Sequence, residues 1–380
     1  MLAVTPDRSF TSDNTAGGAP EVIAAIAAAA AGQAPPYGTD DWTLSAQRRF
    51  SEVFDRDVDV LPVSTGSAAN ALSLAALTPP WGSVLCHRDS HINNDECGAP
   101  EFFTGGAKLL ALGGENAKID ADELQAAVHR KAGDVHTAQP SVVSLTQATE
   151  TGAVYTPAEI GHLAGIAKRA GLRVHMDGAR LANAVAASGC SPAELTWRAG
   201  VDVLSFGAIK NGSLTTDAIV VFERSVTTEL RFRAKRAGQL AAKMRFAAAQ
   251  LDAYLADDLW LRNARHANSM TARLEAGLKS IPGARIAGRP EANILFCRLS
   301  PRVIDGLLDQ GYGFYHGRWE PDVVRFVTSF ATTTHDVDGL VRAVRRLAAA
   351  AIEENRSRRD RRQRPSGGRR SEVACIGGVR

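Results

Sequence analysis

The sequence predicts an α/β fold in which a mostly parallel central sheet, flanked by helices, is followed by a smaller C-terminal α+β domain. Between residues 58 and 221, short β-branched or apolar runs alternate with helical ones, an order typical of parallel sheets built from βαβ units. After Ser225 the pattern changes to a long helix-rich stretch that ends near Ile281. Two further strand candidates and a final helix then indicate a second, smaller domain that contains both helices and strands.

The expected elements follow one another in a regular order. In the first part, strands are expected at residues 58–64, 83–87, 107–112, 141–147, 172–177, 201–207 and 218–223, and helices at 68–77, 120–131 and 157–170. The last of these helices has the clearest boundaries, because Thr156 precedes Pro157 and Gly171 follows the final turn. In the second part, strands are expected at 292–299 and 322–330, and a last helix at about 336–355.

These changes of pattern divide the chain into four expected parts. They are an N-terminal arm (1–20), a large α/β domain (21–250), a small α+β domain (251–355) and an Arg-rich tail (356–380). The tail holds nine Arg against Asp360 and Glu372, so it carries +7 and the remainder of the chain −4. With so few large apolar residues, the tail is expected to be disordered. It has no interleaved aromatic residues and no groove-reading motif, so nucleic acid is not expected as a partner.

Composition and motifs argue against several classes of protein. The longest apolar stretch, residues 23–31, is mostly Ala and is shorter than the roughly 20 residues that span a bilayer. No export signal is recognised, so a cytoplasmic protein is expected. The five Cys are scattered without zinc spacing, and we expect reduced thiols and no metal site. The fingerprints of dinucleotide-binding proteins, P-loop proteins, zinc proteases and serine hydrolases are all absent from the sequence.

Polar residues that follow the expected strands are the first candidates for a site, because ligands of open parallel sheets bind beyond the carboxyl ends of the strands. Asp177 directly follows one strand, and Arg180 comes three residues later. A carboxylate here can keep a ring nitrogen protonated, and a guanidinium can bind a carboxylate. Lys210 follows the next strand in a Gly-flanked loop, where an amine can serve Schiff-base chemistry. A single lysine is more commonly a solvated surface charge.

Two further polar clusters complete the candidate site. Thr65, Gly66 and Ser67 lead from a strand into a helix, where free amides, hydroxyls and the helix dipole can bind a phosphate. A simple capping turn is the alternative interpretation. The segment 87–103 places His87, His91, Asp95 and Glu96 close together between apolar segments, and so polar a loop favours a site over a structural turn.

The combination and order of these clusters resemble those of the low-specificity L-threonine aldolases, within the superfamily of β-eliminating lyases and threonine aldolases. The resemblance extends from Phe10 to Phe330. It is carried by the segments FTSDN, YGTDDWT, TGSAANALSL, HINNDECGAPEFF, LTQATETGAVY, VHMDGAR, AELTWRAGVDVLSFGAIKNG, KRAGQLAAKMRF and VRFVTSF. It implies fold type I of the pyridoxal 5'-phosphate (PLP) enzymes, the PLP-dependent transferase-like fold, with residues 21–250 as the PLP-binding domain.

The resemblance also implies a role for each matching residue. Lys210 would hold PLP as a Schiff base, Asp177 would contact the pyridine nitrogen and His91 would stack on the ring. Gly66 and Ser67 would bind the phosphate with help from Thr65 or Ser64. The substrate carboxylate would be held by Ser12, Arg180 and Arg325, and Arg180 would contact the cofactor as well. From strand alternation alone, Arg325 would instead point outward into solvent between Val324 and Phe326.

Further positions carry looser expectations from the same resemblance. Tyr37 and Asp40 lie in a segment that reaches the site near a subunit boundary in this family, which is commonly tetrameric and built from dimers. A homotetramer or homodimer is therefore expected. Glu150 and Gln147 follow a strand and would lie in or beside the site, and Lys235, Arg236 and Lys243 would approach a neighbouring subunit's phosphate. One departure from the family is Ile209, since the residue before the PLP lysine is often Thr or Ser.

The implied activity is cleavage of L-threonine, L-allo-threonine or a related β-hydroxy-α-amino acid to glycine and an aldehyde. His91, or a water held by Glu150, would accept the hydroxyl proton. Another PLP reaction on the same scaffold, such as β-elimination, transamination or racemisation, is the nearest alternative. A catalytically silent binding or regulatory protein is an alternative of a different class, and the intact set of Lys210, Asp177 and Arg180 argues against it.

Overall fold

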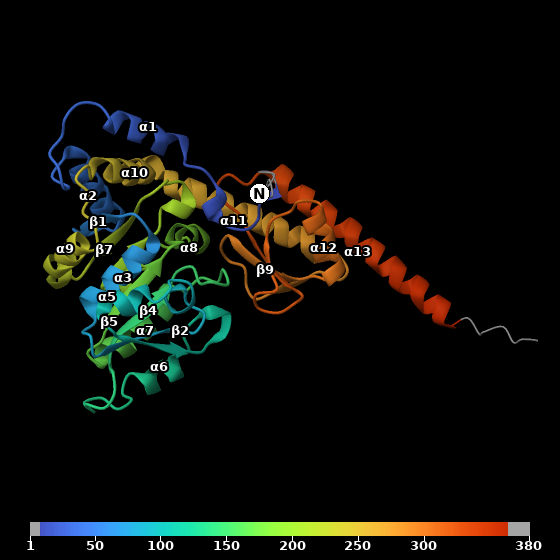
Figure 1. The fold of residues 1–380 in the computed structure, drawn as a ribbon, viewed down its shortest axis with the longest axis horizontal. Coiled ribbons are helices and arrows are strands. Elements are labelled where there is room, and N and C mark those ends of the chain that lie inside the picture. Colours follow the sequence, from blue (N-terminus) through green and yellow to red (C-terminus); the bar gives the residue numbers. More distant parts are fainter. Residues whose placement is uncertain (1–7, 364–380) are drawn as a thin grey trace, which may run out of the picture.

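The computed structural model describes residues 8–363, and it contains a large sheet of seven strands and a small sheet of four (Figure 1). The large sheet has the order β1-β7-β6-β5-β4-β2-β3. Its strands are β1 (Asp59–Val63), β2 (Gly82–His87), β3 (Lys108–Leu112), β4 (Gln139–Thr146), β5 (Arg173–Gly178), β6 (Val203–Phe206) and β7 (Asp217–Val221). Strands β3, β2, β4, β5 and β6 pair in parallel, whereas β7 is antiparallel to both β6 and β1. The expected mostly parallel sheet is confirmed.

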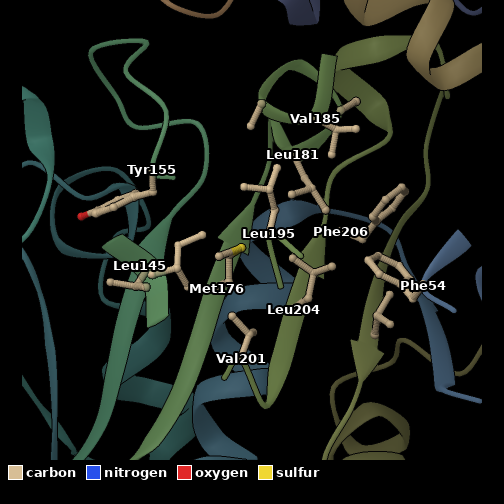
Figure 2. Close-up of a cluster of buried hydrophobic side chains, with 14 of the residues drawn as sticks. Phe54, Leu145, Tyr155, Met176, Leu181, Val185, Leu195, Val201, Leu204 and Phe206 are labelled. Atoms are coloured by element: carbon tan, nitrogen blue, oxygen red, sulfur yellow. The ribbon is translucent and has the colours of Figure 1, made fainter. Parts of the chain in front are cut away.

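Helices cover both faces of this sheet, because its strands are apolar on both sides. Val84 of β2 packs in one core, whereas its neighbour Leu85 packs in another, as expected when successive side chains point to opposite faces. Figure 2 shows part of the core that contains Leu85, with Leu145, Met176, Leu204 and Phe206 gathered in it. The helices of this region are α1 (Pro20–Ala29), α2 (Asp41–Val53), α3 (Gly66–Leu77), α4 (His91–Asn94), α5 (Ala99–Thr104), α6 (Ala121–Ala127), α7 (Pro157–Arg169), α8 (Leu181–Ser188), α9 (Thr227–Arg236) and α10 (Arg245–Leu255).

Helix α7 shows how local sequence sets an element's boundary. The Thr156 hydroxyl accepts a hydrogen bond from the Glu159 amide, and the Glu159 carboxylate accepts one from the Thr156 amide, which is a complete capping box. Pro157 occupies the first helical position, where its missing N–H costs nothing. The predicted start of this helix is confirmed.

The small sheet has the order β10-β11-β9-β8, and all of its pairs are antiparallel. Helix α11 (Leu259–Lys279) contributes side chains of its first half to the large core and of its second half to the small one. The N-terminal segment also joins the small core, where the Phe10 ring lies against Phe326. The remaining elements are β8 (Arg285–Ala287), β9 (Ile294–Arg298), α12 (Pro301–Asp309), β10 (Tyr315–His316), β11 (Val323–Val327) and α13 (Thr334–Gln363).

The last helix is longer than the sequence pattern indicated. Helix α13 extends to Gln363, past Asn355 and into the expected tail, and it projects away from the body (Figure 1). Arg, Glu and Gln have high helix propensity, so a charged composition does not by itself end a helix. The remainder of the Arg-rich tail, 364–380, lies outside the described residues. Within residues 8–363, no helix combines the length and apolar composition needed to cross a bilayer.

Candidate active site

The predicted site residues Gly66, Asp177 and Lys210 line one pocket at the carboxyl ends of the central strands. Asp177 lies near the end of β5, and Lys210 lies on a single 3-10 turn, η5 (Ile209–Asn211), beyond the end of β6. Gly66 begins α3, directly after β1. The three residues come from different parts of the chain and meet here because their strands end at the same edge of the sheet.

The N-terminus of α3 lies at this pocket, which Gly66 lines. The Thr65 hydroxyl caps the helix by accepting a hydrogen bond from the Ala68 amide at 3.0 Å. The amides of Gly66 and Ser67 donate to no other residue within the described chain, and Gly66 lines the pocket. The capping role and the anion-binding role predicted for this segment are therefore compatible.

Asp177 is a buried carboxylate held from two sides. Its Oδ1 accepts the Ala179 amide at 3.0 Å, and its Oδ2 accepts the side-chain amide of Asn70 at 2.9 Å. Asn70 donates to the Glu96 carboxylate as well, at 2.8 Å. Asp177 is therefore fixed in orientation, as a carboxylate must be if it is to contact a ring nitrogen.

His91 belongs to the same network of hydrogen bonds as Asp177 and Asn70. Its Nδ1 lies 2.8 Å from Oε1 of Glu96, and this contact raises the pKa of His91 against the opposing effect of burial. Burial raises the pKa of Glu96 too. The His91 side chain is 43% exposed, so it is accessible to a ligand in part. Asp177, Asn70, Glu96 and His91 thus form one continuous polar network.

Glu150 joins this network through the main chain. Its Oε1 accepts the His91 amide at 3.0 Å, and burial raises the pKa of Glu150 to about 7. A carboxyl group with this pKa can both accept and donate a proton near neutral pH. Gln147 is close to Glu150 in sequence, but its side chain holds the main chain of Tyr155. Its Nε2 donates to the Tyr155 carbonyl, and its Oε1 accepts the Tyr155 amide.

The raised pKa of Glu150 predicts a pH-dependent stability difference between the wild type and Glu150→Gln. Between about pH 4.5 and 7, the folded state keeps a proton that the unfolded state has lost, so wild-type stability falls as pH rises through this window. Glutamine keeps an acceptor for the His91 amide but carries no charge. As pH increases from about 5 to 8, we expect the free energy of unfolding of the variant to rise relative to that of the wild type, by up to about 3 kcal/mol. The measurement is the difference between the two melting temperatures at each pH. A difference that does not change with pH would contradict the assigned pKa.

The loop that carries Lys210 is held by a carboxylate that the sequence did not single out. Oδ1 of Asp217 accepts the amides of Ala208 and Ile209 at 2.7 and 2.9 Å, and burial raises the pKa of Asp217. Asn211 secures the other side of the loop through bonds to the Tyr254 hydroxyl and the Trp260 carbonyl. The loop is therefore fixed without a hydroxyl side chain at position 209. Ile209, where Thr or Ser was expected from the resemblance, does not leave the loop unsupported.

Arg180 is bound by an acid from the N-terminal segment. Its Nε and Nη2 donate to the two carboxylate oxygens of Asp13 at 2.8 and 2.9 Å. Burial alone would raise the pKa of Asp13, but the charge of Arg180 and its hydrogen bonds hold that pKa below the usual value. Ser12 lies beside this pair and caps the 3-10 turn η2 (Asp13–Thr15), which packs next to η5.

Arg325 is half-buried in β11, between the fully buried Val324 and Phe326. Strand alternation predicted the burial of these neighbours but not the surroundings of Arg325 itself. The guanidinium lies over the rings of Tyr315 and Trp319, at 4.7 and 5.7 Å from their centroids. Its Nε is buried and has no hydrogen-bond partner in the described part of the chain. Burial and the charge of Arg180 lower the pKa of Arg325 to about 10, so it remains a cation at neutral pH.

The structure places Tyr37 outside the pocket that contains Lys210. Tyr37 lies on the loop between α1 and α2, is 50% exposed, and has Lys235 Nζ 4.8 Å above its ring. Asp40, in the same loop, caps α2 by accepting the Thr43 amide. Neither residue lines the pocket that contains Lys210.

Sequence reasoning missed three polar residues that shape the site: Asp13, Asn70 and Asp217. A signal existed for Asn70, because it is one of few polar side chains within the apolar helix α3. Asp13 lies in the segment FTSDN, which the family resemblance had already marked. Nothing local distinguishes Asp217 from an ordinary acid at the start of a strand.

Known proteins share this sequence and architecture over almost their whole length. The family model described as beta-eliminating lyase matches residues 9–300. A low specificity L-threonine aldolase of Pseudomonas aeruginosa is 43% identical over 343 residues, which are 90% of this chain and 99% of the relative. Another, from a Pseudomonas species, is 43% identical over 308 residues, covering 81% and 89%. A solved structure of Leishmania major threonine aldolase has a TM-score of 0.84 at 27% identity, covering 90% of this chain and 99% of that one. These findings confirm the predicted fold type, and the chain belongs to the beta-eliminating lyase family.

Proposed function

We propose that this chain is a PLP-dependent aldolase that cleaves L-threonine, L-allo-threonine or a related β-hydroxy-α-amino acid to glycine and an aldehyde. The observation that carries the proposal is the placement of Lys210, the buried Asp177 and Gly66, at the N-terminus of α3, around one pocket. This set occurs in a chain that matches low specificity L-threonine aldolases over most of its length.

The pocket residues fit PLP. The Lys210 side chain lines the pocket, so its amine would be available for a covalent link to the cofactor aldehyde. Asp177 would hold the pyridine nitrogen, and the amides of Gly66 and Ser67, with Thr65, would hold the phosphate. His91 would contact the face of the ring. When bound, PLP accepts the electrons released as the Cα–Cβ bond of the amino acid breaks.

Two cations would bind the substrate carboxylate. Arg325 has a buried Nε without a partner, and Arg180 has a free Nη1 within the described chain. A carboxylate between two guanidinium groups is fixed in both position and orientation, which aligns the Cα–Cβ bond for cleavage. Ser12, next to Asp13, would add a hydroxyl to this subsite.

Arg325→Ala is expected to weaken glycine binding about ten- to a hundredfold, because one charge-assisted contact contributes roughly 1.5–3 kcal/mol. PLP content should stay normal, since Arg325 is on the small sheet and does not line the pocket of Lys210. The measurement is a glycine titration followed by the visible absorption of the bound cofactor. Unchanged glycine affinity in a folded variant would place the carboxylate elsewhere.

The hydroxyl proton of the substrate has two candidate acceptors. The contact with Glu96 raises the pKa of His91. Glu150, with a pKa of about 7, is ionised in a substantial fraction of molecules at neutral pH. His91 and a water held by Glu150 are therefore both proposed as acceptors, and His91 would also contact the ring.

Assembly into homodimers or a homotetramer is part of the proposal. The exposed Tyr37 and the nearby Lys235 lie away from the pocket of their own chain, so they are available to a neighbouring subunit. Light scattering on the purified protein gives the number of subunits, and a monomer with full activity would contradict a shared site.

The proposed reaction is tested by product analysis. Incubation with L-threonine should release glycine and acetaldehyde in equal amounts, whereas β-elimination from serine or a related amino acid would release pyruvate and ammonia. A panel of β-hydroxy amino acids then ranks the substrates. Bound PLP without glycine release from any of them would refute the aldolase proposal.

A further inference from the structure

Asp13 is a buried acid at the meeting point of three separate segments. Its side chain is almost fully buried, and it pairs with Arg180, which lies between β5 and α8. It also accepts a hydrogen bond from the side-chain amide of Asn293 at 2.9 Å. Asn293 immediately precedes β9 of the small sheet and donates to the Thr328 carbonyl as well. The carboxylate thus connects the N-terminal segment, the large sheet and the small sheet.

The bidentate pair fixes the Arg180 guanidinium in one plane. Nε and Nη2 are both bonded to Asp13, so rotation about the end of the side chain would break two charge-assisted hydrogen bonds. Nη1 is the only terminal nitrogen of this group without a partner in the described chain. A ligand can therefore meet Arg180 only at the edge that Asp13 leaves free.

Asp13 also offsets part of the positive charge of Arg180 and Arg325. Arg180 and Arg325 are close enough for the charge of Arg180 to contribute to the lowered pKa of Arg325. Without Asp13, two partly buried cations would face each other with no fixed counter-ion. With Asp13 ionised, the three groups carry a net charge of +1, which matches one substrate carboxylate, and the unpartnered Nε of Arg325 still requires an acceptor.

We propose that Asp13 is a positioning residue for the substrate carboxylate: it holds Arg180 in the orientation in which its free edge acts together with Arg325. The inference rests on the proposed function, because it needs Arg180 and Arg325 to bind that carboxylate. Asp13 acts through Arg180 and does not touch the substrate.

The first test compares Asp13→Asn with Asp338→Asn in the holoenzyme. Asp338 is a matched control, because Arg273 donates its Nε and Nη2 to it at 2.7 and 2.8 Å in the same bidentate geometry, but on the exposed surface. We expect Asp13→Asn to raise the KM for L-threonine about ten- to a hundredfold, with a smaller change in kcat and normal PLP content. Asp338→Asn should leave all three unchanged.

The second test asks whether Asp13 acts through Arg180. In an Arg180→Ala background, adding Asp13→Asn should change KM by less than about twofold, because the group it positions is already gone. If the two effects on KM multiply, Asp13 has an independent role and the inference is wrong. A wild-type KM in the single variant Asp13→Asn overturns it too.

Arg180→Lys tests the bidentate pair from its other side, and it serves if Asp13→Asn does not fold. Arg180→Lys retains a positive charge beside Asp13 but cannot donate two parallel hydrogen bonds, so its KM should also rise about tenfold or more. A wild-type KM in this variant would show that the bidentate pair is not needed. These outcomes are separate from a failure of the proposed function, which would appear as a wild-type protein that releases no glycine.

Discussion

Lys210→Ala is expected to lower the rate of glycine release from L-threonine by several orders of magnitude. In the proposed function the Lys210 amine would form the covalent link to PLP and would be released again for the substrate, so its removal would abolish both roles. The loop around it should stay folded, because Asp217 and Asn211 hold it through bonds that do not involve the Lys210 side chain. The visible absorption band of lysine-bound PLP should disappear together with the activity.

Lys279→Ala is the matched control for this variant. Lys279 lies at the end of α11, is mostly exposed, and pairs with Glu275 of the same helix. Its removal should change neither the absorption band nor the rate. Glycine release near the wild-type rate in Lys210→Ala would exclude Lys210 as the residue that binds the cofactor.

Asp177→Asn is expected to reduce the rate about a hundredfold or more while leaving part of the PLP bound. Asparagine fills the same space and can still accept from Asn70, but it cannot hold a positive charge on the pyridine nitrogen. Lys210 and the α3 amides, which are proposed to bind the cofactor, are unchanged in this variant. The measurements are kcat and the PLP content of the purified variant.

Asp202→Asn is the matched control, because it changes another buried acid of the same sheet. Asp202 precedes β6, away from the pocket, where it accepts the Val174 amide and pairs with Lys168. Its replacement should lower the melting temperature and leave kcat unchanged. If both variants lost stability and activity in parallel, the effect of Asp177→Asn would be one of folding and the assigned role would fail.

Much of the large domain could be predicted because its signals are local. Strands β4, β5 and β6 are short apolar runs, and α7 carries its own cap and proline. Strands β8 and β10 were missed, because very short strands have too few residues to show a period. The extension of α13 beyond Asn355 was missed as well, because its charged residues continue the helix without an apolar pattern. The direction of β7 was also beyond reach, since its sequence is equally suited to parallel and antiparallel pairing.

The sequence by itself determined which residues could carry the chemistry: Asp177, Lys210 and the Thr65 to Ser67 turn each follow a strand, and the βαβ order places such positions at one edge of the sheet. Only the tertiary structure decided how their neighbours act. It paired Asp13 with Arg180, and it placed Asn70 between Asp177 and Glu96. Those contacts join residues far apart in the chain, and their energies depend on burial and distance, which are properties of the packed molecule and not of any local pattern.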